Sequence, residues 1–435
     1  MSKDRLYSAA FGFNTDRRVK PVHFATGFFL SILGRHSEQR AMNRAVALTA
    51  GGKEDDDYSL ASVSELLKGE PPRVVASVSA EAIHALRKHL SCLADNDEAV
   101  FPAFAEKAGF GCNYSICSQK FIGDFKDNDG FAGHFTHKIL EATPDGRRII
   151  ELATEWLTAS TSTLHRAFQP LLDAADEQEW ENRYDARFGT LEQDRVQRIS
   201  RLMADKTKAV RLVCENSRLA FSTETSARNL IVALCIWLFD YLLIESVADE
   251  SKPLLVTDFS GDAHSRMRAQ SRWSYARLRE EILESFHRFD AAGRFADLDD
   301  AGEQKKNSLK AQQLFGTLAL RSGIAQPRAS RVTAKHFEPQ PDTLRVLVMS
   351  VLSVEDGMIP ETELAERLFR VWGLCFGARS DDAAHLADAG FTGLDQDHDL
   401  TPNAEAFVGL LCELGLATRF SDGLVMAHSR PSFSP

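Results

Sequence analysis

Three oxygen-bearing side chains follow directly on a short apolar run and are the residues best suited to hold a cation. The run 254–257 is followed by Asp258, Ser260 and Asp262. Open α/β proteins place ligands at the carboxyl ends of strands, and carboxylate and hydroxyl oxygens suit hard divalent cations such as magnesium. One hypothesis is therefore a metal site at these three residues. The alternative, which we favour, is a buried strand that leads into a capped turn.

A second set combines two thiols and two imidazoles. Cys112 and Cys117 are five positions apart, and His134 and His137 are three positions apart, in a stretch rich in glycine. Thiolate and imidazole are the ligands of structural zinc sites. Both spacings lie at or outside the common finger pattern, so core thiols with partly exposed imidazoles are the favoured alternative. The stretch 109–135 is predicted to be extended.

A third set is a series of arginines on one predicted helix, 264–289. Five of them could contact nucleic acid or an acidic partner: Arg266, Arg268, Arg272, Arg277 and Arg288. Arg266, Arg277 and Arg288 stand eleven residues apart, which is about three helical turns, so they share one face. A basic helix face of this kind can lie along a phosphate backbone. A solvated face paired with neighbouring glutamates is the favoured alternative.

No set of catalytic residues is complete in this sequence. It contains no phosphate-binding loop, no dinucleotide fingerprint and no Gly-x-Ser-x-Gly elbow. We therefore expect a protein that is not an enzyme and needs no cofactor, with zinc or magnesium as the alternatives named above. A metal-dependent phosphoester hydrolase that uses Asp258 and Asp262 is the competing hypothesis.

The elements that would position these residues are mostly helices. Helical periodicity predicts helices over 147–160, 163–175, 191–216 and 225–246. The predicted fold is mainly α with a smaller α/β part. Four regions are expected: a mixed α/β region over 1–145, a helical domain over 146–321, a proline-containing linker over 322–341 and a separate domain over 342–435.

The last part of the chain shows the pattern of a helix, a turn and a hairpin. Apolar residues recur at helical spacing at Phe407, Leu410, Leu411 and Leu414. Gly415 then suits the left-handed end of a helix. Strands are predicted at 416–420 and 424–427, around a turn at 421–423. With helices predicted at 344–354 and 361–369, the pattern resembles a winged-helix domain over about residues 342–430.

Charge decides which partner this resemblance implies. From Pro341 onward the sequence holds 15 Asp or Glu and 6 Lys or Arg. A winged helix that reads DNA places a basic or amide-rich helix in the groove and neutralises phosphates with Lys and Arg. Here the corresponding helix, 402–414, offers Asn403, Glu405 and Glu413 and no basic residue. We therefore predict that Glu405 and Glu413 contact a protein partner.

Composition is that of an ordinary globular chain. Its 435 residues carry a net charge of −11, and its seven cysteines are an odd number and widely scattered. Such scatter is typical of reduced thiols in the cytoplasm. The apolar runs 22–33 and 230–239 are too short to span a bilayer. A cytoplasmic location without membrane contact is expected.

These observations lead to one functional hypothesis and two alternatives. We expect a subunit or adaptor of a multi-protein assembly, with the winged helix docking a protein and the arginine helix facing nucleic acid or an acidic neighbour. Bacterial DNA-processing and anti-phage defence systems employ such subunits, an analogy that rests on architecture alone. The alternatives are the hydrolase described above and a DNA-binding regulator.

Overall fold

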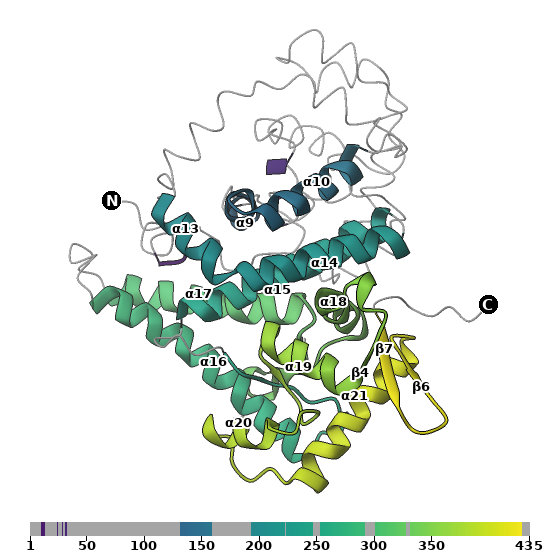
Figure 1. Ribbon diagram of the computed structural model, residues 1–435. Helices are drawn as coiled ribbons and strands as arrows, with labels where there is room; N and C mark the ends of the chain where they lie inside the picture. Colours follow the sequence, from purple (N-terminus) through teal and green to yellow (C-terminus); the bar gives the residue numbers. More distant parts are fainter. Residues whose placement is uncertain are drawn as a thin grey trace, which may run out of the picture. The chain divides into compact units, whose positions relative to one another are not determined.

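The computed structural model describes residues 10–13, 24, 28, 31–32, 131–158, 193–221, 223–246, 253–291, 301–327 and 331–428 (Figure 1). Over these residues the chain is mainly α, with a smaller α/β part, as the sequence predicts. Contacts divide it into two compact units: 1–200 with 223–228, and 201–222 with 229–435. The predicted boundaries at 145, 321 and 341 do not coincide with this division.

The first unit is described mainly through three helices. They are α9 (Phe131–Glu141), α10 (Pro144–Thr158) and the part of α13 (Gln193–Leu202) that ends at residue 200. The extended structure predicted up to residue 135 is wrong from residue 131, where α9 begins. Ala132, Phe135 and Ile139 are buried at helical spacing. This helical period was missed because the stretch is rich in glycine and aromatic residues, which favoured extended structure.

The second unit is built around a helix that is apolar on all sides. Residues 229–243 of α15 (Thr223–Ser246) are buried at nearly every position, as expected for a core helix. By length and composition, Thr225–Ser246 is the one candidate membrane span among the described residues, and 89% of it is buried inside the structure. The second helix of this core is α14 (Ala204–Ala220), and its Lys206 meets Asp240 of α15 at 3.0 Å.

A small sheet brings distant parts of the second unit together. Strand β1 (Leu255–Val256) pairs in parallel with β5 (Leu374–Cys375), and Thr257 bridges to Phe337 in parallel on its other side. Strand β3 (His336–Phe337) pairs antiparallel with β2 (Ala325–Gln326). Helix α16 (Arg266–Ala291) packs against both β1 and β3, and α17 (Ala301–Arg321), which periodicity did not predict, packs against α16.

The predicted linker is wrong, because residues 322–341 belong to this core. Ile324, Ala325 and Phe337 are completely buried, and Thr343 Oγ1 donates to the Ser322 carbonyl at 2.7 Å. Strands of two residues are too short for hydrophobic periodicity to register, and the nearby prolines favoured a loop. The C-terminal part, from residue 342 onward, is therefore part of the same compact unit as the helices and strands just before it.

The C-terminal elements form a second, antiparallel sheet with four helices. The helices are α18 (Pro341–Val351), α19 (Glu361–Trp372), α20 (Asp382–Asp388) and α21 (Thr401–Glu413). Strands β4 (Met358–Pro360), β7 (Val425–His428) and β6 (Ala417–Arg419) lie in that order. The helices and the hairpin that we predicted here are present, and Gly415 has a φ of +64°.

Candidate functional site

A buried set of charges lies where the small sheet meets α16. Arg268 contacts the Asp258 carboxylate through Nε and Glu338 Oε2 through a terminal nitrogen at 2.9 Å. His336 Nε2 lies 2.8 Å from the same Glu338 oxygen. We call Asp258, Arg268, His336 and Glu338 the Arg268 cluster. Asp258 is completely buried, and Arg268 and His336 are nearly so.

Three elements converge to build this cluster. Asp258 follows β1, Arg268 lies in the first turn of α16, and His336 and Glu338 belong to β3 and the residue after it. Ser260 fixes the Asp258 carboxylate from the turn, because its amide and hydroxyl donate to Asp258 Oδ1 at 3.1 and 2.7 Å. Both Asp258 oxygens therefore have partners within the chain, as buried carboxylates require.

The charges of the cluster stabilise one another. The pKa of Glu338 is lowered from its ordinary value, first by the hydrogen bond with His336 and then by the charge of Arg268. His336 Nδ1 lies 3.0 Å from the Ala334 carbonyl, so both ring nitrogens face acceptors. Hydrogen bonds at both nitrogens fix the orientation of the ring between Ala334 and Glu338.

Two residues of the predicted cation site, Asp258 and Ser260, are hydrogen-bonded to each other, and the third, Asp262, lies in the turn that follows. Among the described residues, Asp258, His336 and Glu338 offer ligand atoms within 4.8 Å of one another. Asp262 is exposed, and its carboxylate accepts from the His264 amide at 2.8 Å. A site that combines Asp258, Ser260 and Asp262 stays a prediction, and it would require a cation to displace the Arg268 guanidinium. Sequence reasoning missed His336 and Glu338 because they fell inside the supposed linker.

Only half of the predicted zinc set lies among the described residues. His134 and His137 are one turn apart on α9. His134 is buried, with Nδ1 2.9 Å from Ser31 Oγ. The pKa of His137 is lowered to about 4, by burial and then by the charge of Lys138. Cys112 and Cys117 lie outside the described residues, so the zinc set stays a prediction.

The arginines of α16 do not form one free basic face. Arg268 is buried in its cluster, which corrects its assignment as a nucleic-acid contact, and Arg272 is half-buried. Arg266 and Arg277 are exposed, but they contact the segment 389–399. Arg266 lies 3.5 Å from Asp399 Oδ2, and Arg277 donates to the Ala389 carbonyl at 2.5 Å. Arg288 has no described side chain, so its role stays a prediction.

Asn403 is a structural clamp and not part of an outer recognition surface. Its Nδ2 donates to the Thr257 and Phe376 carbonyls at 3.0 and 2.9 Å, and its Oδ1 accepts from the amides of residues 259 and 260 at 2.7 and 3.1 Å. The side chain is completely buried and joins α21 to the strand ends of the small sheet. Glu405 and Glu413 of the same helix are exposed.

The sheet β4–β7–β6 has one buried face and one apolar face that is partly open. Ile359, Ala417, Val425 and Ala427 are buried on the inner face. The register pairs Met358 with His428, and Thr418 with Met426, on the other face. Alternation extends this outer face by one residue past each strand, to Phe420 and Leu424, which are joined by a backbone hydrogen bond of 2.8 Å.

No protein-family model matches the sequence, and no curated protein or solved structure matches it either.

Proposed function

We propose that the chain is a non-enzymatic subunit of a multi-protein assembly and that it docks a partner through the outer face of the sheet β4–β7–β6. One observation carries this proposal: Met358, Phe420 and Leu424 are 47%, 44% and 48% exposed on that face. Phe420 and Leu424 lie together at the turn end of this face, and Met358 lies on the same face opposite His428. Large exposed apolar side chains on one face can mark an interaction site. We call Met358, Phe420 and Leu424 the apolar sheet face.

Charge complementarity specifies the chemistry of the partner. Glu355 and Asp422 are exposed beside the apolar sheet face, and the chain from Pro341 onward has nine more acidic than basic residues (15 against 6). A partner segment with apolar side chains flanked by lysine or arginine fits such a surface, because opposite potentials steer association and fix its register. The exposed carboxylates of Glu405 and Glu413 would extend the contact.

The order of the C-terminal elements supports a winged-helix classification within this proposal. Helix α18, strand β4 and helices α19 and α21 precede a hairpin, and the sheet order is β4–β7–β6. The segment between α19 and α21, which contains β5 and α20, departs from the simplest form of such a domain. We retain the assignment to a bacterial DNA-processing or anti-phage assembly in the cytoplasm as an analogy from architecture.

The two alternative functions have less support. A hydrolase would need Asp258 to meet metal and substrate, but its carboxylate is buried against Arg268. A DNA-binding regulator would read DNA through the winged helix, but α21, the helix expected in the groove, carries no lysine or arginine. Neither alternative explains the exposed apolar sheet face.

Photo-crosslinking in the native cells tests the proposal. We expect benzoyl-phenylalanine at position 420 to capture one partner protein, identified by mass spectrometry. The same group at position 309 is the control. Leu309 on α17 is comparably exposed (47%) but lies outside the apolar sheet face, so this position should not capture the partner. The partner is then purified and mixed with the chain, and the complex is measured by size exclusion and calorimetry.

The combined change Phe420→Ser and Leu424→Ser should weaken that reconstituted complex at least about tenfold, because apolar anchors dominate interface energies. The matched change Leu309→Ser should leave it unaltered. Equal affinity of both variants, or a crosslink that joins position 420 only to the chain's own residues 429–435 or to a second copy, would refute the proposal.

A further inference from the structure

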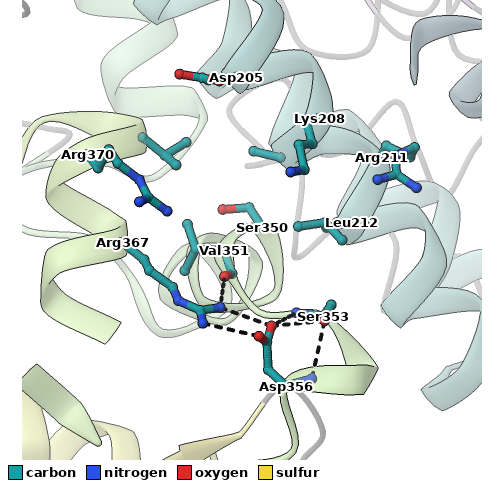
Figure 2. A pocket seen from close by; sticks show the side chains of 12 residues that line it. Asp205, Lys208, Arg211, Leu212, Ser350, Val351, Ser353, Asp356, Arg367 and Arg370 are labelled. Atoms are coloured by element: carbon teal, nitrogen blue, oxygen red, sulfur yellow. Dashed lines mark hydrogen bonds and ion pairs between the residues drawn. The ribbon is translucent and has the colours of Figure 1, made fainter. Parts of the chain in front are cut away.

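A cavity of about 570 Å³ lies beside the C-terminal end of α18, within the second unit. It is lined by residues of α14, of the α18 end with the turn after it, and of α19. Figure 2 shows Lys208 and Arg211 of α14 on one side and Arg367 and Arg370 of α19 on the other. Three segments far apart in sequence therefore share this hollow.

The lining is predominantly basic. Lys208, Arg211, Arg367 and Arg370 face Asp205 and Asp356, so four positive side chains line the cavity with two negative ones. This charge contrasts with the acidic character of the C-terminal part, from which two of the four arise. An anion that enters the hollow is attracted by the positive side chains around it.

Of these four cations, Arg367 and Arg211 are held by carboxylates of the chain, whereas no described carboxylate holds Lys208. Arg367 is held by Asp356 at 2.9 Å and Glu363 at 2.7 Å, and Arg211 is held by Glu215 at 2.8 Å. The pKa of Asp356 is lowered to about 2, chiefly by its hydrogen bond with Arg367. Lys208 is exposed on α14 and makes no ion pair with the described residues. A guanidinium held in place on one side of the cavity and an exposed ammonium on the other suit an anionic group with several oxygens.

We propose that this cavity binds a small phosphorylated sugar or polyol. Its volume lies within the range of small-molecule sites. Phosphate is the group that arginine and lysine recognise best together. The lining contains no aromatic side chain on which a nucleobase could stack, so the proposed ligand carries no base. Asp205, which lines the cavity, accepts hydrogen bonds from the hydroxyl groups of the ligand. This binding function goes beyond partner docking and does not depend on it.

Calorimetry on the full chain with ribose 5-phosphate, pyrophosphate and ribose tests the proposal. We expect saturable binding of ribose 5-phosphate, weaker binding of pyrophosphate because it lacks the hydroxyls that meet Asp205, and none of ribose. Lys208→Gln and Arg370→Gln should each weaken the binding of ribose 5-phosphate at least about tenfold, because hydrogen bonds to charged groups are the strong ones. Binding should also weaken as salt is raised.

The matched control is Arg419→Gln, which removes an exposed positive charge from β6 outside the cavity. It should leave the dissociation constant unaltered. All three substitutions are at exposed positions, and circular dichroism checks that each variant is folded. Absence of saturable binding of ribose 5-phosphate to the unmodified chain would refute the proposal, and so would equal weakening by all three variants or binding of ribose as tight as that of its phosphate.

Discussion

Arg268 explains how Asp258 can be completely buried next to a second carboxylate. Its guanidinium contacts Asp258 and Glu338 together, and a buried charge is tolerated when it is paired and hydrogen-bonded. Breaking a buried pair by removing one partner typically costs about 3–5 kcal/mol, because the other charge is left without compensation. The role of this residue is therefore structural, since it holds the end of β1 against α16 and the segment after β3.

We expect Arg268→Met to lower the free energy of unfolding by about 3–5 kcal/mol, since it leaves Asp258 buried without a counter-charge. Arg266→Met, two residues earlier on α16 but at an exposed position, should change it by less than about 1 kcal/mol. Urea denaturation followed by circular dichroism measures both. Equal stability of the two variants would contradict this account of the Arg268 cluster.

The pH dependence of unfolding gives a second test of the same cluster. The pKa of Glu338 is lowered in the folded chain, by His336 first and by Arg268 after it. Its contribution to stability is therefore complete above the ordinary pKa of a glutamate and is lost as pH falls through the lowered value. In Arg268→Met this loss should be smaller and should be complete at a higher pH, because one of the two causes of the lowered pKa is removed.

At the scale of elements, the end of α19 is fixed by a close backbone approach. Gly373 has a φ of +70° and ends the helix, and its carbonyl accepts from the Leu255 amide at 2.8 Å. A Cβ atom at this position would lie 2.2 Å from the Pro253 carbonyl oxygen. The absence of a side chain therefore lets β5 follow α19 directly and pair with β1.

Gly373→Ala is expected to destabilise the chain by more than about 3 kcal/mol, because the backbone strain adds to a steric clash with Pro253. The matched control is Gly393→Ala. Gly393 also has a positive φ, +80°, but nothing lies within 4 Å of its added Cβ, so it should lose only about 1–2 kcal/mol. Chemical denaturation of both proteins checks the difference, and similar losses would show that the close approach is unimportant.

At the scale of the whole molecule, the C-terminal part completes the core of the second unit. Strand β5 pairs with β1, α18 packs against α14, and Asn403 binds the Thr257 carbonyl. Asn216 of α14 also donates to the carbonyls of Met349 and Leu352 at 2.8 and 2.6 Å. These contacts join segments separated by more than a hundred residues.

Truncation after Asp342 should therefore unfold the second unit and not release an independent domain. We expect the truncated chain to lose cooperative thermal unfolding in this unit and to become sensitive to limited proteolysis across 253–291, because β1 and α16 lose their partners. Hydrogen exchange of those amides gives the finer measurement. A truncated chain that retains protection there would restore the picture of a tethered C-terminal domain.

Local sequence determined the long helices and the C-terminal hairpin. The apolar residues from 229 to 243 are nearly continuous, and Gly415 follows a clear helical period, so both elements could be predicted without tertiary information. The turn at 421–423 was likewise readable, because its residues favour tight turns. The mainly α character of the chain follows from these local signals.

Tertiary structure alone decided which charges meet. Arg268 looked like its neighbours on a basic helix, and only the fold placed it against Asp258, ten residues away, and Glu338, seventy residues away. Asn403 and residues 322–341 likewise looked exposed, because strands of two residues and single buried amides leave no periodic signal. Burial and pairing depend on which distant segments come into contact, and local spacing in the sequence does not encode that.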